Sequence, residues 1–221
     1  MLIVLSQAVA APPAELRAAR DRQDRPALEK AIAALAAQSE KKPADAEAQY
    51  VLALAQSYLA EICLELRLRN EARAAAEKGI QAAEKATQLK PQQAEYHRIL
   101  GTLCGQVIPA NVLAGLKYGK CAMESVNKAL QLDAKSSMGW LSKGVGNYYL
   151  PPSFGGGVDL AIKDMEKAIS LDPKSSDAYV WLGTALRKKN LNAEARKALE
   201  KALELNPQRI WAKQLLEKTP Q

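Results

Sequence analysis

Small and large apolar residues recur at helical spacing in the last third of the chain. Within residues 176–209, Gly183 and Ala195 are small residues that would let two antiparallel helices cross closely, and Leu199 is the large residue that would fill the groove between them. Pro207 follows the second apolar series, and a proline cannot continue a helix. The pattern therefore predicts one pair of antiparallel helices over this segment.

The same series of small, large and small residues recurs four times upstream, most weakly in the first copy. Its members are Ala161, Met165 and Ala168; Ala122, Val126 and Ala129; Gly79, Ala83 and Ala86; and Ala31, Leu35 and Gln38. The copies end at positions that lie 48, 43, 39 and 34 residues apart, namely Pro43, Pro91, Ala134, Pro173 and Pro207. Inserted residues thus become fewer toward the C-terminus. We expect five helix pairs, at about residues 12–45, 46–93, 94–136, 137–175 and 176–209, with a capping helix at 209–218.

This arrangement resembles the tetratricopeptide repeat family, whose glycine, alanine, leucine and proline positions are matched by the last pair. The resemblance implies an all-α fold in which helix pairs stack into a right-handed superhelical array with one concave and one convex side. The composition agrees, because Ala, Leu, Glu, Lys, Gln and Arg dominate and no alternating β-branched segment occurs. We therefore expect residues 11–221 to form a single helical repeat domain.

A second resemblance covers residues 94–209 and includes the segment that runs from Tyr148 and Tyr149 through Leu-Pro-Pro-Ser-Phe to two glycines. This part is similar to two groups of tetratricopeptide proteins, the periplasmic T component of TRAP-type transporters and the regulator of microtubule dynamics family. The resemblance implies an adaptor role. The prolines and glycines of residues 151–157 also predict a wide turn, with the next helix beginning near Val158.

The basic charge of the chain changes this picture little. There are 31 Lys and Arg residues against 24 Asp and Glu residues, which gives a formal net charge of +7. Most of these charges alternate in sign along helix faces, as is typical of solvated surfaces. No nucleic-acid motif accompanies them, so we expect no nucleic-acid partner. We also expect no transmembrane segment, because no later stretch is apolar enough to cross a bilayer.

The first ten residues are apolar and end in Ala8-Val-Ala10, which is a plausible signal-peptidase site, followed by Ala11 and two prolines. Residues 1–10 therefore read as the remnant of a signal peptide. This predicts a periplasmic or secreted protein. The alternative is a cytoplasmic protein whose N-terminus is an ordinary frayed end.

The residues that usually carry catalysis or bind metals are few in this chain. His97 is the only histidine, and its place in the repeat favours a packing role over that of a general base. Cys63, Cys104 and Cys121 match no standard metal spacing, and no phosphate-binding loop follows a strand. We expect no enzymatic activity, no metal and no cofactor. Cys104 and Cys121 belong to one repeat and could pair, but we expect all three cysteines to be small buried hydrophobic residues.

The resemblance also implies a binding surface, because in the repeat family the first helix of each pair lines a concave groove. Applying that register selects tyrosines, which combine apolar area with a polar tip, and basic side chains, which bind carboxylates. The candidate groove residues are Tyr50, Tyr58, Arg98, Tyr148, Tyr149, Arg187 and Lys188. Some of these tyrosines could instead pack between repeats.

The function that follows is a non-catalytic protein–protein interaction scaffold that binds a peptide or protein partner in the concave groove. Two alternatives stay open from the sequence. One is a periplasmic small-ligand-binding component associated with a transporter, which would need the groove to close into a pocket. The other is an enzyme, which would need a cluster of titratable groups around His97.

Overall fold

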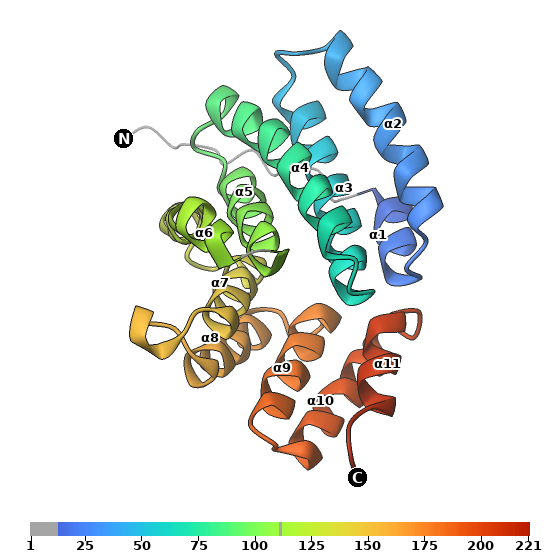
Figure 1. Cartoon of the computed structure of the whole chain (residues 1–221), viewed down its shortest axis with the longest axis vertical. Coiled ribbons are helices and arrows are strands. Elements are labelled where there is room, and N and C mark those ends of the chain that lie inside the picture. The colour runs from blue at the N-terminus through green and yellow to red at the C-terminus, as the bar shows by residue number, and fades with distance from the viewer. Residues whose placement is uncertain (1–12, 111) are drawn as a thin grey trace.

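The computed structural model describes residues 13–110 and 112–221, and within them it contains helices and no strand (Figure 1). The expected signal-peptide remnant at residues 1–10 lies outside the described residues. The α-helices are α1 (Ala14–Asp21), α2 (Arg25–Lys41), α3 (Ala46–Glu65), α4 (Arg69–Leu89), α5 (Ala94–Val107), α6 (Val112–Leu132), α7 (Ser137–Tyr149), α8 (Val158–Leu171), α9 (Ser176–Lys188), α10 (Asn192–Leu205) and α11 (Ile210–Glu217). Two short 3-10 helices are η1 (Ile108–Ala110) and η2 (Pro152–Phe154). No helix of the described part has the length and apolar character of a membrane span.

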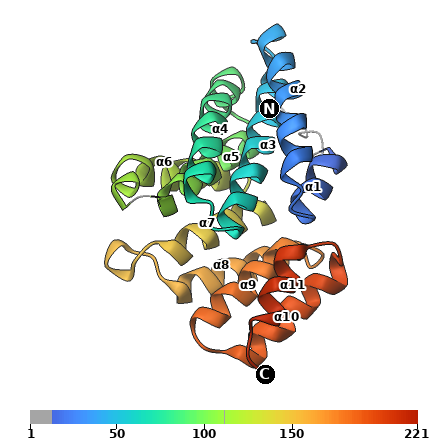
Figure 2. The ribbon, with the colours of Figure 1, turned by 45° about the vertical axis from the view of Figure 1, so that its right-hand side comes forward.

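Consecutive helices pack in pairs, from α1 with α2 to α9 with α10, and α11 packs on the last pair (Figures 1 and 2). The predicted all-α array of five helix pairs with a C-terminal cap is therefore confirmed. In the second and third pairs the inserted residues lengthen the helices: α3, α4 and α6 contain 20, 21 and 21 residues, whereas α9 and α10 contain 13 and 14.

Local sequence signals determine where several of these helices begin. The side chains of Asp45, Ser136 and Ser175 accept hydrogen bonds from backbone N–H groups in the first turns of α3, α7 and α9. Such N-caps satisfy donors that have no partner inside the helix. They fix the start of the first helix in three of the five pairs.

Small residues let the paired helices approach closely, as the sequence predicts. A Cβ atom at Gly183 in α9 would lie 2.7 Å from Leu199 Cγ in α10, and one at Gly101 in α5 would lie 2.7 Å from Val126 Cγ2 in α6. Both distances are shorter than a van der Waals contact, so these positions admit only glycine without a shift of the neighbouring helix.

The inserted residues of the fourth pair form the wide turn between α7 and α8. After Tyr149 the chain passes through η2, and Gly155 and Gly157 have φ angles of 82° and 120°. These left-handed conformations favour glycine. Helix α8 begins at Val158, where the sequence predicts it.

An ionic cluster joins the two ends of the array, and no pattern in the sequence indicates it. We call it the clasp; it consists of Arg20 and Asp21 from α1, Glu61 and Glu65 from α3, Asp177 from α9, and Arg209 at the start of α11. Figure 2 shows the N-terminal helices α1 and α3 next to the C-terminal helices α9 and α11. The concave side of the array is therefore closed between its first and last helices.

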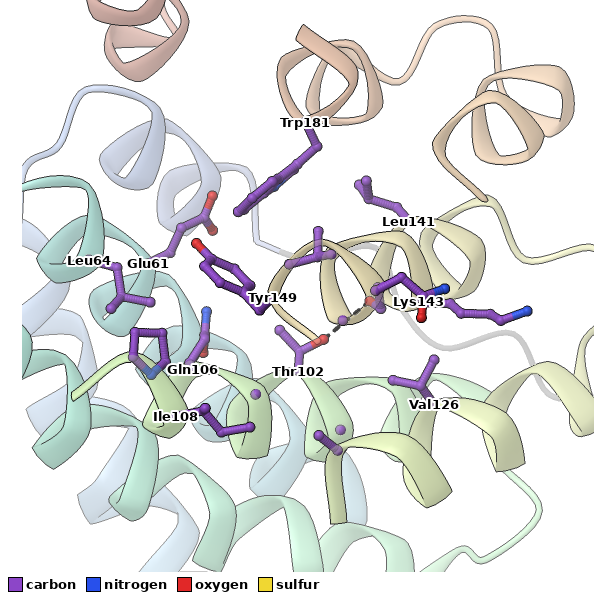
Figure 3. A pocket seen from close by; sticks show the side chains of 18 of the residues that line it. Glu61, Leu64, Thr102, Gln106, Ile108, Val126, Leu141, Lys143, Tyr149 and Trp181 are labelled. Carbon is purple, nitrogen blue, oxygen red and sulfur yellow. Dashed lines mark hydrogen bonds between the residues drawn. The ribbon is translucent and has the colours of Figure 1, made fainter. Parts of the chain in front are cut away.

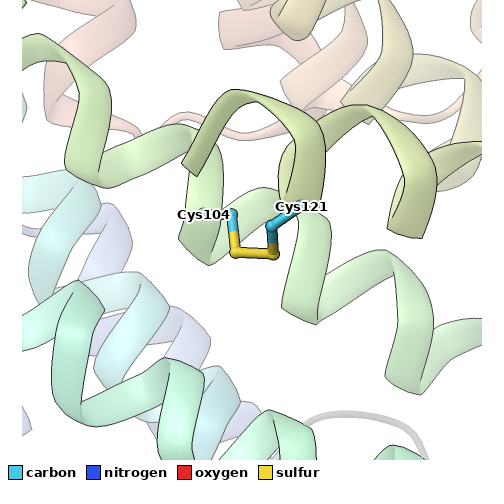
Figure 4. The surroundings of a disulfide bond; sticks show 2 residues. All are labelled: Cys104 and Cys121. Carbon is cyan, nitrogen blue, oxygen red and sulfur yellow. A yellow bond between two sulfur atoms is a disulfide. The ribbon is translucent and has the colours of Figure 1, made fainter. Parts of the chain in front are cut away.

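A disulfide bond between Cys104 and Cys121 links α5 to α6 (Figure 4). The expectation that all three cysteines are unpaired is wrong for these two. The antiparallel packing of α5 and α6 brings their Cα atoms to 6.0 Å, which lies within the usual range for a disulfide. Cys63 is a free, fully buried thiol, as expected.

Candidate functional site

A cavity of about 1090 Å³ lies on the concave side, between the first helices of the later pairs and the clasp (Figure 3). Its walls come mainly from α3, α5, α6, α7, α9 and α11, together with the turn that contains η2 and smaller contributions from α1 and α8. Most of its lining side chains are apolar or aromatic. They include Leu54, Leu64, Ile99, Ile108, Val126, Leu141, Val145, Tyr149, Trp181 and Trp211.

Aromatic side chains form one wall of this cavity, which we call the aromatic wall: Tyr149 of α7, Trp181 of α9 and Trp211 of α11. The ring centroids of Tyr149 and Trp181 are 6.3 Å apart, and those of Trp181 and Trp211 are 5.0 Å apart, both in edge-to-face geometry. Edge-to-face packing of this kind fixes the orientation of the rings. Half of Tyr149 is exposed.

The wall opposite Trp181 is formed by α5, α6 and α7, and we call it the helical wall (Figure 3). Several of its polar side chains pair with neighbours. Thr102 and Ser142 share a hydrogen bond of 3.2 Å, and Arg98 Nη1 lies 3.4 Å from Ser142 Oγ. The Gln106 amide accepts from the Ser57 hydroxyl and donates to the Ser57 carbonyl oxygen, both at 3.1 Å.

Arg98 is buried in this wall and is held by Glu95, one turn away on α5. Its Nε and Nη2 atoms donate to the two carboxylate oxygens of Glu95 at 2.6 and 2.5 Å. Burial alone would lower the pKa of Arg98, but the Glu95 carboxylate outweighs burial and holds the pKa above its ordinary value. The guanidinium is thus a permanent, already paired cation, and it is not free to capture a partner's carboxylate.

The clasp forms the third side of the cavity, where Arg20, Glu61, Glu65 and Asp177 belong to the lining. Arg209 is fully buried and donates to Glu61 at 2.6 Å and to Glu65 at 2.5 Å. Arg20 donates to Asp177 through both terminal nitrogens at 3.0 Å. The polar groups of this side are therefore charged and paired with one another, and the clasp contains four carboxyl groups against two guanidinium groups.

The pKa values of two carboxyl groups of the clasp are shifted in opposite directions. Burial raises the pKa of Glu65 to about 7, although Arg209 counteracts this shift. Burial also acts to raise the pKa of Asp177, but Arg20 and Arg209 outweigh it and hold that pKa below the ordinary value. Glu65 is consequently the member of the clasp whose charge changes near neutral pH.

The structure divides the seven candidate groove residues into two sets. Four of them line the cavity: Tyr58, Arg98, Tyr149 and Arg187. Three do not, namely Tyr50, Tyr148 and Lys188.

The assignment of Tyr50 to the groove needs correction, because this side chain is only 1% exposed and stacks on Tyr96 with ring centroids 5.1 Å apart. Tyr148 and Lys188 contact each other outside the lining: the Lys188 ammonium lies 4.4 Å from the centroid of the Tyr148 ring and donates to the Tyr148 carbonyl oxygen. The single imidazole is also absent from the lining: His97 is partly buried, and its Nε2 lies 2.8 Å from the carbonyl oxygen of Pro91.

The repeat register does not predict several of the residues that line the cavity. Trp181 belongs to α9 but is not one of the register positions, Trp211 lies on the capping helix, and Glu61 lies in the extended part of α3. The second helix of the third pair, α6, contributes Gly115, Gly119 and further residues, although the register considers only first helices. The one available signal in the sequence was the presence of glycines at helical spacing in α6.

Comparison with known proteins supports the architecture. Residues 157–218 match the family model described as tetratricopeptide repeat. The solved structure of TTC0263, a thermophilic tetratricopeptide repeat protein of Thermus thermophilus, is 19% identical with a TM-score of 0.64 over 94% of this chain and 100% of that chain. The HusA haemophore of Porphyromonas gingivalis is 19% identical with a TM-score of 0.57 over 84% of this chain and 96% of that chain. No curated protein matches the sequence.

These findings define the chain first as a helical repeat protein with a closed concave face. Its fold is that of the tetratricopeptide repeat proteins, and residues 157–218 match the model of that repeat family.

Proposed function

We propose that this protein is a non-catalytic interaction scaffold that holds a segment of a peptide or protein partner at the mouth of its concave cavity. The tetratricopeptide repeat fold supports the general role of an interaction scaffold. The observation that carries the finer proposal is the cavity of about 1090 Å³, in which aromatic side chains of three repeat elements form one wall. Tyrosine, tryptophan and arginine are the residue types that most often anchor protein interfaces.

The chemistry of the mouth favours a partner segment with a bulky apolar side chain next to acidic residues. The half-exposed ring of Tyr149 offers apolar contact area. Arg187 and Lys218 add positive charge to the lining, and Arg187 is oriented by a hydrogen bond of 3.2 Å to the Lys218 carbonyl oxygen. An apolar anchor flanked by carboxylates would complement both features.

The test is affinity capture with the purified protein as bait, followed by measurement of the captured partner's affinity. Tyr149→Ala and Arg187→Ala should each weaken binding by about thirtyfold, as expected for an anchor that contributes about 2 kcal/mol. Leu89→Ala is the matched control, because Leu89 is 41% exposed and lies outside the cavity. Equal binding by all three variants would refute the proposed surface.

The non-catalytic part of the proposal concerns His97, the imidazole that an enzyme would most readily use as a base. Its hydrogen bond to the Pro91 carbonyl oxygen and its position outside the cavity support a role in the turn before α5. We therefore expect His97→Ala to bind the partner like the wild type. A loss of binding or of any turnover of the bound partner in this variant would contradict the proposal.

We also propose that the protein acts in the periplasm or is secreted. The disulfide between Cys104 and Cys121 supports this location, because disulfides persist mainly in oxidising compartments. Cell fractionation followed by mass spectrometry of the N-terminus tests it. Recovery of an uncleaved, thiol-reduced protein from the cytosol would refute the location and leave the binding proposal untouched.

A further inference from the structure

We propose that the helical wall of the cavity binds the hydrocarbon part of a small amphipathic molecule, such as an acyl chain, whose polar head lies toward Glu61 and the aromatic wall. The volume of about 1090 Å³ is slightly above the range of about 300–1,000 Å³ that is typical of small-molecule pockets. The proposal rests on four features of the cavity and does not depend on the identity of any protein partner.

The first feature is a set of helical glycines that open onto the cavity. A Cβ atom added at Gly105, Gly119 or Gly146 would meet no atom within 4 Å, and one at Gly115 would meet only the Ile108 side chain at 3.9 Å. All four glycines line the cavity. A glycine weakens a helix relative to alanine, and here no close contact with a neighbouring helix requires glycine. Their effect is to keep the volume empty.

Glycines elsewhere in the helices have a different role. A Cβ atom at Gly79 would lie 2.6 Å from Leu103, and one at Gly183 would lie 2.7 Å from Leu199. Those residues allow two helices to pack against each other. Gly105, Gly115, Gly119 and Gly146 differ from these close-packing glycines, and also from Gly101 of the cavity lining, because they face open space.

The second feature is the distribution of exposed apolar side chains. Within the described residues, eight large hydrophobic side chains are exposed, and five of them line this cavity: Met123, Met138, Tyr149, Phe154 and Leu160. Apolar surface that gathers in one concave place is typical of a binding site, whereas single exposed residues are ordinary.

The third feature is the pairing of polar groups on the helical wall. Thr102 and Ser142 bond to each other, and Gln106 bonds to Ser57 through both ends of its amide. A peptide backbone laid against this wall would need partners for its own N–H and C=O groups. A hydrocarbon makes no such demand, so the wall suits a hydrocarbon better than an extended peptide.

The fourth feature is the position of hydroxyl and carboxylate groups at the other side of the cavity. Figure 3 shows Glu61, Tyr149 and Trp181 pointing toward one another, across the cavity from Ile108 and Val126. A molecule with its hydrocarbon on the helical wall would therefore place its polar head among polar side chains. This arrangement accommodates an amphipathic ligand in one orientation.

The experiment uses N-phenyl-1-naphthylamine, a neutral dye whose fluorescence rises in apolar sites, with the purified full chain. Straight-chain alcohols of increasing length should displace the dye, and each added methylene should strengthen displacement about fourfold until the cavity is full. Gly105→Leu and Gly119→Leu should weaken dye binding at least tenfold while the melting temperature stays equal or rises, because the new side chains occupy empty space. Ala34→Leu is the control, since it adds the same side chain on the exposed face of α2.

The inference fails if the dye does not bind, if displacement is independent of chain length, or if both leucine variants bind the dye like the wild type. Displacement by the protein partner or its peptides alone, and not by alcohols, would also overturn it while leaving the scaffold proposal standing. Conversely, loss of dye binding by Gly105→Leu, together with wild-type capture of the protein partner, would show that the hydrocarbon lies on the helical wall and that the partner does not need this wall.

Discussion

Replacing Arg209 by alanine should destabilise the protein at neutral pH more than the loss of any exposed ion pair. Arg209 is fully buried, donates to Glu61 and Glu65, and lies 3.6 Å from Asp177 and 3.9 Å from Asp21. Without this guanidinium, four carboxylates would share Arg20 as the remaining cation of the clasp. Removal of one partner from a buried ionic group typically costs about 3–5 kcal/mol. That is a large fraction of the stability of an ordinary domain, which is about 5–15 kcal/mol.

The assay is urea denaturation followed by circular dichroism at pH 7.5 and at pH 5. The free energy of unfolding should fall by about 3–5 kcal/mol at pH 7.5. The deficit should shrink at pH 5, because protonation of carboxyl groups such as Glu65 removes part of the repulsion that the variant creates. Small-angle scattering of the folded variant shows in addition whether the two ends separate, which would increase the radius of gyration.

Arg25→Ala provides the matched control, because it breaks an ion pair of 3.1 Å with Glu29 in which the side chains are 32% and 51% exposed. Such surface pairs contribute about 0–1 kcal/mol. A loss below about 1 kcal/mol in Arg209→Ala, indistinguishable from this control, would refute the reasoning that the clasp is a buried and energetically coupled group.

Three further predictions concern single features of the fold. Between about pH 5 and 7 the wild type should lose stability as the pH rises, because burial raises the pKa of Glu65 to about 7 and the folded state keeps a proton that the unfolded carboxyl has released. Glu65→Gln should reduce this dependence of the unfolding free energy on pH, measured by urea titration. An unchanged dependence would contradict the assignment to Glu65. Gly183→Leu should lower the unfolding free energy by about 1–3 kcal/mol by overpacking against Leu199, and an unchanged thermal midpoint would show that the two helices do not cross there. Reduction of the bond between Cys104 and Cys121, which are 17 residues apart, should cost about 3 kcal/mol, measured as a difference between denaturation curves with and without dithiothreitol; coincident curves would count against the bond.

The helix pairs could be predicted from the sequence because their determinants are local. The contact of Gly183 with Leu199 joins residues of one helix pair, and a repeated spacing reveals it without knowledge of the rest of the molecule. The turn before α8 is equally predictable, because its prolines and glycines act within a few residues of one another. Register arguments therefore give the architecture reliably.

The site could be predicted only in part, because it depends on how the pairs stack. Of the register positions, Tyr58 and Tyr149 line the cavity, whereas Tyr50 does not, because α3 packs against α5 and the Tyr50 ring stacks on Tyr96 between the two pairs. The clasp could not be predicted from the sequence at all. Its contact between Arg209 and Glu61 joins residues 148 positions apart, and it requires the accumulated curvature of all the intervening pairs.

Closure by the clasp changes how such a stack can unfold. In an open solenoid each unit contacts only its neighbours, so the terminal units fray first and the rest can persist. Here the first and last helices stabilise each other, and neither end is a free end. Loss of α11 should therefore destabilise α1 and α3. Amide hydrogen exchange should show the first and last helices protected to the same degree.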